Sequence, residues 1–510
     1  MRLAVGIVLA LGLAAQFSLV RMDVSVWVRP SLERISQTEE PSNVRDISLS
    51  GARGEVESFQ IAVRSEAPGS SVRQIVFSDL RDDAGHVIPA GTFSLYTEHY
   101  VQVSPGSPDL RGKNQPLGEG WYADALIPFA SPALTAGRNQ PFWVDISIPR
   151  DARPGSYNAT YTIVMDKSAV AGSIRMTVWH FDLPLRPALK SSFGTNADSH
   201  RHAVEAELLK NKLAPANPSA ENEREYIDNY GMSSAGLGFW SGANYGNCSM
   251  SAPPSVRQLR RERRRHEANL QLYNYSADEV DACFGQFDTL KAWARNLHAA
   301  DIPNLVTTTP SPELLDDGSG TGRSAVDIWV LLPRMYDRAV GVVATVKRKG
   351  DEVWSYNALS QEDYSPKWLI DYPPVDFRIQ PGFISQSLGL TGVLYWRVDW
   401  WYGPRWDSVN NDGTFGDYNA PGDGKLVYPL DQIGIDGVAP SMRLKWLRDG
   451  VEDYEYVELL KKRGAGEWAL SLARSAGRNW VEWSRDPLVL QSVRRQLGER
   501  LDQLASSGTK

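Results

Sequence analysis

Two adjacent acidic residues, Asp278 and Glu279, stand just after a short apolar and aromatic segment, residues 272–275. Neighbouring carboxylates repel each other and cost stability, so their presence favours a function such as proton transfer. The alternative is structural, because an aspartate at the start of a helix caps it and interacts favourably with the helix dipole. Asp278 and Glu279 are therefore the candidate catalytic residues.

Aromatic residues end two further apolar segments and continue into the loop after the second. The chain has 17 Trp, 20 Tyr and 14 Phe, most of which we expect to fill the core. A few would instead contact sugar, because the flat apolar faces of sugars pack on aromatic rings. Carboxylates for proton transfer beside such rings are typical of a sugar-processing site. The predicted substrate-binding residues are Tyr273, Trp354, Tyr356, Tyr395, Trp396 and Trp400.

The elements that must position these residues lie between residues 188 and 436, where apolar runs alternate with helical patterns. Helices are predicted over 284–299 and 332–347. Such alternation predicts a (β/α)8-like catalytic barrel of the TIM type, in which the C-terminal ends of the strands face the active site. The acids and the aromatic rings would then converge on one mouth. The predicted strands are 237–240, 272–275, 305–308, 328–331, 353–356 and 393–396.

Residues 23–185 show a different pattern, with a period of two. Phe59, Ile61 and Val63 alternate with other residues, and turn signals separate this run from similar ones. Short alternating strands with regular turns predict a β-sandwich. We expect this domain to support the barrel without taking part in chemistry, and Asp145 has the outward parity of its strand.

The last part of the chain, residues 437–505, is predicted to be a helical extension. Leu444, Leu447, Val451 and Tyr454 recur at intervals of three and four, which gives one apolar helix face. The predicted fold is thus multidomain, of α/β plus β class, with an N-terminal β-sandwich, a central (β/α)8-like barrel and this extension. A proline-rich linker at residues 183–187 separates the first two parts.

Residues 1–22 read as a signal peptide or an uncleaved anchor. Arg2 precedes an apolar run over residues 3–20 that contains small residues. This predicts a secreted, periplasmic or extracellular protein that touches a membrane only if the anchor is retained. In an exported chain Cys248 and Cys283 form a disulfide or remain two buried thiols.

Charge and spacing argue against several other classes of function. A net charge of −7 lacks the basic footprint that nucleic acids require. His200 and His202 have no accompanying cluster of acids or cysteines, and Asp412, Asp417 and Asp423 lack EF-hand spacing. We therefore expect a glycan partner and no metal or cofactor.

Several motifs together indicate one known family. They are residues 51–60 (GARGEVESFQ), 154–157 (PGSY), Asp278 and Glu279, 354–356 (WSY), 422–429 (GDGKLVYP) and 443–456 (RLKWLRDGVEDYEY). On these motifs the chain resembles glycoside hydrolase family 123, whose characterised members are β-N-acetylgalactosaminidases. The resemblance spans nearly the whole chain after its N-terminal apolar segment, but it is poor over residues 219–250.

The resemblance implies a sandwich, a barrel and a C-terminal extension, together with substrate-assisted catalysis that retains the anomeric configuration. In such a reaction the 2-acetamido oxygen of the sugar attacks the anomeric carbon and forms an oxazolinium ion. By the family pattern, Asp278 would orient the acetamide and stabilise the charge, while Glu279 would protonate the leaving oxygen and later activate water. Val280 stands where many relatives have proline.

Three functions compete on this sequence. The first is an exported, exo-acting β-N-acetylgalactosaminidase, and the second is a hydrolase of another β-glycoside on the same scaffold. The third is an inactive carbohydrate-binding surface protein. The intact pair of Asp278 and Glu279 argues against the third, because an inactive relative has no reason to keep two acids that repel each other.

Overall fold

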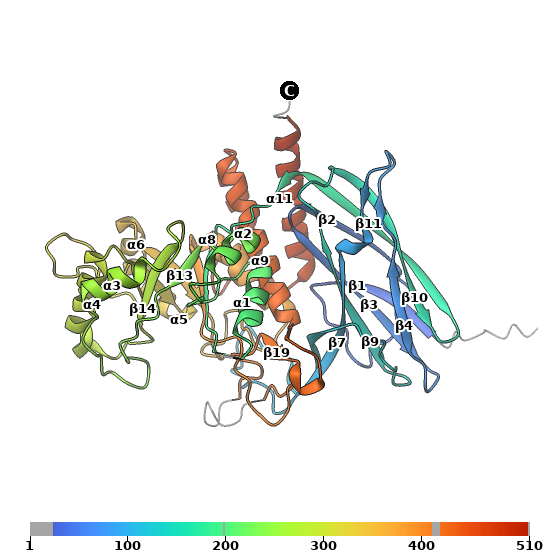
Figure 1. Ribbon diagram of the computed structural model, residues 1–510, viewed down its shortest axis with the longest axis horizontal. Coiled ribbons are helices and arrows are strands. Elements are labelled where there is room, and N and C mark those ends of the chain that lie inside the picture. The colour runs from blue at the N-terminus through green and yellow to red at the C-terminus, as the bar shows by residue number, and fades with distance from the viewer. Residues whose placement is uncertain (1–23, 197–198, 411–418, 508–510) are drawn as a thin grey trace, which may run out of the picture.

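The computed structural model describes residues 24–196, 199–410 and 419–507. A β-sandwich and a barrel lie on opposite sides of the molecule, and the C-terminal helices stand between them (Figure 1). This architecture confirms the predicted fold class. The predicted signal peptide or anchor, residues 1–22, lies outside the described residues. Within the described part of the chain, every helix is too short or too polar to span a bilayer.

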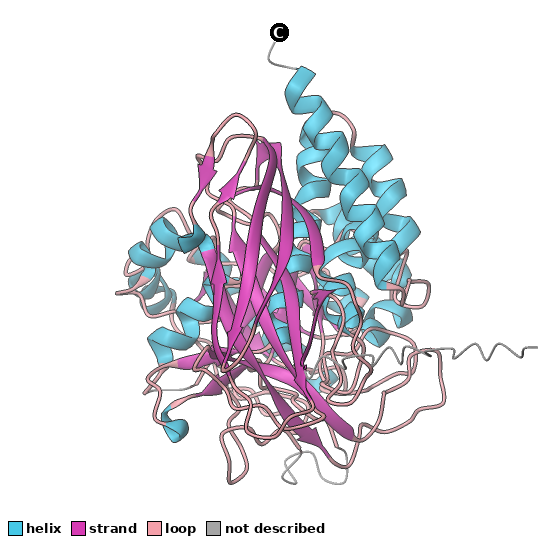
Figure 2. Ribbon diagram, turned by 90° about the vertical axis from the view of Figure 1, so that its right-hand side faces the viewer, coloured by secondary structure: helices cyan, strands magenta, loops and turns pink. Residues whose placement is uncertain are grey.

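The sandwich consists of two sheets, whose long strands run side by side (Figure 2). The first sheet has the strand order β1-β3-β9-β7-β8, and the second has the order β2-β11-β10-β5-β6, with β4 paired to β10. The first comprises β1 (Val24–Pro30), β3 (Val56–Ser65), β7 (Phe93–Val103), β8 (Gly120–Pro128) and β9 (Asn139–Ser147). The second comprises β2 (Asp46–Arg53), β4 (Val72–Phe77), β5 (Leu80–Arg81), β6 (Val87–Ile88), β10 (Gly155–Met165) and β11 (Ala169–Asp182), and the 3-10 turn η1 (Ala90–Thr92) precedes β7.

The core between the two sheets follows the predicted alternation. Phe59, Ile61 and Val63 are buried there. Asp145 points away from this core, as its parity predicts, but it is only 5% exposed because a C-terminal helix covers that face of the first sheet. The first sheet is therefore buried on both faces, which the period-two pattern did not reveal.

Seven parallel strands form the barrel in the order β12-β18-β17-β16-β15-β14-β13. Residues 214–216 close the ring: Phe193 N donates to Ala214 O at 3.0 Å, and Gly236 N donates to Ala216 O at 2.8 Å. This short segment occupies the place of an eighth strand between β12 and β13. The strands are β12 (Lys190–Phe193), β13 (Ser234–Gly236), β14 (Gln271–Ala277), β15 (Asn304–Thr307), β16 (Ile328–Leu331), β17 (Glu352–Tyr356) and β18 (Gly392–Tyr395).

Most predicted barrel elements are present, with two differences. The strand predicted at 237–240 is wrong, because β13 comprises residues 234–236, and after Leu237, whose N donates to Tyr273 O at 2.9 Å, the backbone of Phe239 exchanges hydrogen bonds with the Asn274 side chain. The helix predicted at 332–347 is two helices broken at Ala339. The barrel helices are α1 (Arg201–Lys210), α2 (Glu223–Tyr230), α3 (Val256–Arg263), α4 (Phe287–Ala299), α5 (Pro333–Arg338), α6 (Val340–Lys349), α7 (Pro374–Ile379) and α8 (Ser385–Leu388), with a π-turn η4 (Gln380–Ile384) joining the last two. Short turns η2 (Phe284–Gln286), η3 (Pro312–Leu314) and η5 (Asp431–Ile433) and the ribbon of β19 (Val427–Pro429) and β20 (Val438–Pro440) complete this part.

The C-terminal helices are α9 (Met442–Lys462), α10 (Gly466–Ala476) and α11 (Pro487–Ser507). The predicted apolar residues of α9, such as Leu444 and Leu447, are buried, but so is every other residue from Met442 to Val457, so the helix has no exposed face over this stretch. Its charged side chains are buried in ion pairs with neighbouring elements. Gly450 lets α9 cross α7 closely, because a Cβ at this position would lie only 2.5 Å from the carbonyl oxygen of Arg378 in α7.

Candidate active site

The acid pair lies at the mouth of the barrel. Strand β14 ends at Ala277, so Asp278 and Glu279 follow directly at its C-terminal end. Asp278 N donates to Ala243 O at 3.1 Å. Glu279 has φ of 48°, in the left-handed region that non-glycine residues occupy at an energetic cost and often at functional sites.

Asp278 is oriented by a neighbour on its own strand. The Tyr275 hydroxyl donates to its Oδ1 at 2.6 Å and lies 2.7 Å from the Thr307 hydroxyl of β15. Burial raises the pKa of Asp278 above its ordinary value, and the hydrogen bonds from Tyr275 and Thr307 offset part of that rise. The carboxylate is thus fixed in direction and partly desolvated.

Glu279 has the electrostatics of a general acid. Burial and the nearby charge of Asp278 raise its pKa to about 7, against the opposing influence of Arg334 at the start of α5. A large share of Glu279 is therefore protonated near neutral pH. This is the state required of a group that donates a proton to a leaving oxygen.

Two further acids, Asp281 and Asp423, also raise the pKa of Glu279, and the carboxylates of both accept hydrogen bonds from neighbouring side chains. Asp281 accepts hydrogen bonds from the hydroxyls of Thr308 and Thr309, at 3.1 Å and 3.0 Å. It therefore joins the end of the acid segment to the loop after β15.

Asp423 belongs to the loop that precedes β19. It is 1% exposed and accepts hydrogen bonds from the Tyr395 hydroxyl at 2.8 Å and from Trp396 Nε1 at 3.2 Å. Burial raises its pKa to about 6, although both hydrogen bonds favour the charged form. Gly422 and Gly424, both with positive φ, form the turn that carries it.

A pocket of about 380 Å³ opens at Tyr275, the residue whose hydroxyl donates to Asp278, although the two acids are not among the residues that line it. Residues following β12, residues 216–217 and residues from the end of β18 surround it, and Tyr275 forms part of its wall. Its lining combines aromatic rings with side chains that can donate to or accept from sugar hydroxyls. These polar side chains are Asn196, Arg201, Asn217 and Arg397.

Several of the predicted substrate-binding residues lie at this mouth. Trp396 lines the pocket, and Trp400 lies against it with ring centroids 5.6 Å apart. Burial raises the pKa of Tyr356, and the nearby charges of Asp278 and Glu279 raise it further, so the Tyr356 hydroxyl lies within electrostatic reach of the pair.

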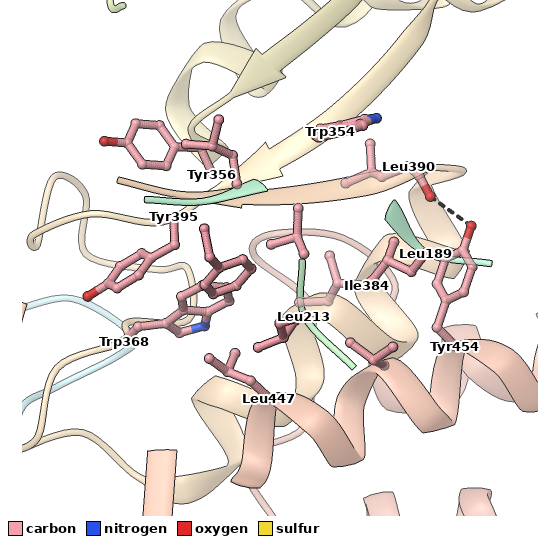
Figure 3. Close-up of a cluster of buried hydrophobic side chains, with 14 of the residues drawn as sticks. Leu189, Leu213, Trp354, Tyr356, Trp368, Ile384, Leu390, Tyr395, Leu447 and Tyr454 are labelled. Carbon is pink, nitrogen blue, oxygen red and sulfur yellow. Dashed lines mark hydrogen bonds between the residues drawn. The ribbon is translucent and has the colours of Figure 1, made fainter. Parts of the chain in front are cut away.

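Two predicted binding residues have no surface to offer a sugar. Tyr273 and Trp354 are 1% and 0% exposed and pack edge to face at 5.7 Å inside the barrel. Trp354 Nε1 donates to Glu352 at the start of β17, so the indole faces away from the mouth. Figure 3 shows the Trp354 nitrogen and the Tyr356 hydroxyl pointing in opposite directions. The interpretation of Tyr273 and Trp354 as sugar contacts is therefore wrong: they are core.

Tyr395 ends β18 and borders the pocket beside Trp396, but its ring is covered. It is 0% exposed and lies across the strands from Tyr356, packed on Trp368 at 5.4 Å (Figure 3). Its hydroxyl also accepts a hydrogen bond from Gly424 N at 2.9 Å. Tyr395 therefore positions the Asp423 turn instead of presenting a ring to sugar.

Sequence reasoning missed Tyr275, Thr307, Arg334 and Asp423. The sequence does contain an indication for Tyr275. This tyrosine points to the same face of its strand as Tyr273 but lies two residues nearer the C-terminal end, where the active site of a barrel is expected. The other three come from separate elements and are brought together only by the closed barrel. Asp412 and Asp417, considered with Asp423 as a group, lie outside the described residues.

The two cysteines form a disulfide between Cys248 and Cys283, across 35 residues of sequence. Of the two alternatives that the sequence left open, the structure has the bonded one. The bond joins the chain after the acid pair to the chain after β13. It therefore borders the candidate site.

A (β/α)8-like barrel whose mouth holds a glutamic acid of raised pKa beside a fixed aspartate is an arrangement found in glycoside hydrolases. Two family models match the sequence: the glycoside hydrolase 123 N-terminal domain over residues 32–165 and the glycoside hydrolase 123 catalytic domain over residues 321–460. The chain belongs to glycoside hydrolase family 123. The second match begins beyond Asp278 and Glu279, so their assignment depends on the geometry described above.

One solved structure agrees with this fold over nearly the whole chain. A family 123 glycoside hydrolase from Clostridium perfringens, described in a study of glycolipid glycan hydrolysis, aligns with a TM-score of 0.66 at 13% identity. The alignment covers 95% of this chain and 98% of that chain. A β-glucuronidase from Parabacteroides merdae aligns with a TM-score of only 0.26 at 10% identity, over 73% of this chain and 47% of that chain. No curated protein matches the sequence.

Proposed function

We propose that the protein is an exported, exo-acting β-N-acetylgalactosaminidase that uses substrate-assisted, retaining catalysis. One observation carries the proposal: Asp278 and Glu279 are consecutive at the barrel mouth, the first held by Tyr275 and the second a weak acid with a pKa of about 7. Such a pair suits a reaction in which one acid directs the substrate's own nucleophile and the other transfers the proton.

In the proposed reaction the acetamido oxygen of the terminal sugar attacks the anomeric carbon while the bond to the leaving oxygen breaks. Glu279 gives its proton to that oxygen. Asp278 accepts a hydrogen bond from the acetamide N–H and stabilises the positive charge of the oxazolinium ion. Glu279, now a carboxylate, takes a proton from a water molecule that attacks the anomeric carbon and opens the oxazolinium ring. Because the anomeric carbon is attacked twice, its configuration is retained.

The engagement of the neighbouring acids supports a nucleophile supplied by the substrate. A retaining enzyme with its own nucleophile holds two carboxyl groups about 5 Å apart on either side of the scissile bond. Asp281 is bound by two threonine hydroxyls, and Asp423 is buried under Tyr395 and Trp396. Neither presents an unengaged carboxylate for attack on an anomeric carbon.

Pocket size and the disulfide support the finer parts of the proposal. A volume of about 380 Å³ is near the small end of ligand pockets, which suits one terminal sugar. The Cys248–Cys283 bond suits an oxidising compartment, in keeping with the apolar N-terminal segment of the sequence. The glycolipid glycans named for the Clostridium perfringens protein favour a glycoconjugate as the natural substrate here.

A matched pair of aryl β-glycosides tests the mechanism. One has a 2-acetamido group and the other a 2-hydroxyl group, in both the galacto and the gluco configuration. We expect cleavage of the acetamido galactoside and at least a 100-fold lower kcat/KM for its hydroxyl partner, since acetamide participation is lost. Equal rates on both would contradict the mechanism, and a preference for the gluco sugar would contradict the assigned substrate.

A further inference from the structure

Residues 237–251, which we name the mouth loop, follow β13 and form a closed, ordered unit. Ser251 N donates to Ser241 O at 2.8 Å and closes its base. At its tip, Asn244 and Asn247 exchange backbone hydrogen bonds of 2.9 and 3.0 Å. Trp293 of α4 donates to the Ser251 carbonyl at 2.8 Å and anchors the loop to the barrel wall.

The mouth loop is fastened to the acid segment at three points. Ser241 N donates to Ser276 O at 3.2 Å, and Asp278 N donates to Ala243 O at 3.1 Å. Cys248 is bonded to Cys283. The loop therefore has a fixed position relative to the two catalytic acids, and side chains that it presents at the mouth are held in place.

Trp240 is such a side chain. It is 46% exposed, and its ring meets Tyr275 edge to face with centroids 5.9 Å apart. Tyr275 in turn donates to Asp278. A large aromatic ring left open to water next to a catalytic pair is typical of a surface that binds a partner with an apolar face.

The position of Trp240 indicates which part of a substrate it faces. The enclosed pocket is bordered by Tyr275, Asn217 and Trp396, and Trp240 is outside its lining. An exo-acting enzyme places the terminal sugar in the enclosed part, and the rest of the glycan leaves through the open rim. Trp240 contacts Tyr275, which lines the pocket and donates to Asp278, and we therefore place Trp240 on that rim.

We propose that Trp240 is the platform for the second sugar of the substrate, the one attached to the leaving oxygen. The apolar face of that ring would stack on the exposed indole, so the preferred substrates are oligosaccharide chains, as opposed to simple alkyl glycosides. The proposal rests on the proposed function, because it requires a terminal sugar to be removed from a chain. It assigns a specificity role to a loop in which the chain resembles its family poorly.

The test compares two substrates with the same terminal sugar: a glycosyl fluoride, which has no second ring, and a disaccharide. Trp240→Ala should lower kcat/KM on the disaccharide about 10-fold, mostly through KM, as expected for the loss of one stacked ring. Its kcat/KM on the fluoride should stay within about twofold of the wild-type value. Trp240→Phe, which keeps a ring, should recover most of the loss on the disaccharide.

Trp468→Ala is the matched control, because Trp468 is 44% exposed on α10, away from the barrel mouth. This variant should leave kcat/KM unchanged on both the fluoride and the disaccharide. Trp240→Leu keeps an apolar contact with Tyr275 but has no flat ring, and it replaces the alanine variant if that variant fails to fold. Equal losses on both substrates, or no loss on the disaccharide, would overturn the proposal.

Failure of the proposed function gives a different pattern. If the wild type cleaves only 2-hydroxyl donors, the substrate-assisted mechanism fails, and the comparison is made with the fluoride and disaccharide of that sugar. If the wild type cleaves neither class, calorimetry replaces the kinetics. The Glu279→Gln variant is titrated with the 2-acetamido disaccharide and with the 2-hydroxyl disaccharide, and the binding affinity of each is measured. Weaker binding after the additional change Trp240→Ala supports the platform, and unchanged or undetectable binding overturns it.

Discussion

Glu279 holds its proton because of a balance between its neighbours. Removal from water and the adjacent Asp278 both disfavour the carboxylate, while Arg334 favours it. The first two influences prevail and raise the pKa to about 7. Asp278, which we propose directs the substrate, thus also raises the pKa of the proposed general acid, and this gives the adjacency of the two residues a second use.

Replacing Glu279 tests this role through the leaving group and the pH. Glu279→Gln should lower kcat on disaccharides by about 10²–10⁴-fold and affect activated aryl glycosides less, because these need less protonation. In the wild type the protonated form is active, so kcat/KM should fall as the pH rises through about 7. That basic limb should disappear in the variant when pH profiles of both substrates are measured.

Glu313→Gln is a suitable control, since Glu313 is exposed in η3 after β15 and should leave both profiles unchanged. A basic limb that persists in Glu279→Gln would show that another group is the acid. Asp423, with a pKa of about 6, would then be the next residue to replace.

At the scale of elements, α9 depends on charges that the sandwich supplies. Lys445 Nζ lies 3.1 Å from Asp145 Oδ2, and Arg448 Nη1 lies 3.4 Å from Asp145 Oδ1. Burial alone would raise the pKa of Asp145, but Lys445 and Arg448 hold it well below its ordinary value. The carboxylate therefore stabilises the contact between β9 and α9.

Asp145→Ala should lower the free energy of unfolding by about 3 kcal/mol, because Lys445 loses its nearest carboxylate and is left with Glu207 at 3.8 Å, while Arg448 is left with Asp449 at 2.8 Å. Asp182→Ala removes an exposed pair with Arg53 and should cost at most about 1 kcal/mol. Since the folded pKa of Asp145 is depressed, its contribution is full above the unfolded pKa of about 3.9 and is lost as the pH falls below it. Urea titrations at pH 7 and pH 3 measure both effects, and equal losses for the two variants at pH 7 would contradict this account.

The sequence predicts an element well when the pattern that identifies it lies within the element's own residues, and poorly when its surroundings come from distant parts of the chain. Strands β14 to β18 contain the predicted apolar runs, and their bounds agree with the predicted ones to within two residues at each end. The closing segment 214–216 is too short to show a period, so it was missed. On α9, the apolar period was read correctly, but the burial of residues such as Arg443 comes from partners in distant elements. Asp278 and Glu279 are predictable because they are adjacent in the sequence. Thr307 and Asp423 are not, because only the folded barrel brings them near the acid pair.

At the scale of the whole molecule, one arginine joins the sandwich to the site. Arg443 of α9 binds Asp124 of β8 through Nε and Nη2, each at 2.9 Å, and its Nη1 donates to the Gly422 carbonyl at 2.8 Å. Both charged side chains are fully buried. Since Gly422 begins the turn that holds Asp423, the sandwich supports the mouth of the barrel through this arginine.

Arg443→Met should lower the free energy of unfolding by about 3–5 kcal/mol, because Asp124 is left buried without a counterion. The double variant Asp124→Leu, Arg443→Met should recover much of that stability, since an apolar pair can replace a buried ion pair. It should not recover kcat, because the bond to Gly422 is still absent. Thermal unfolding and kcat measured on all three proteins separate the two effects, and full recovery of kcat in the double variant would refute the link to the site.

The central place of α9 also has a consequence for the order in which the protein matures. A ribosome delivers more than 440 residues before this helix exists, yet Trp446 binds the Ser31 carbonyl at 2.8 Å and Tyr456 binds Glu55 at 2.7 Å. The face of the sandwich that α9 covers therefore stays open to water throughout most of synthesis. The nascent chain therefore cannot reach its final packing until its last helices are made, and this delay is compatible with the export that we propose.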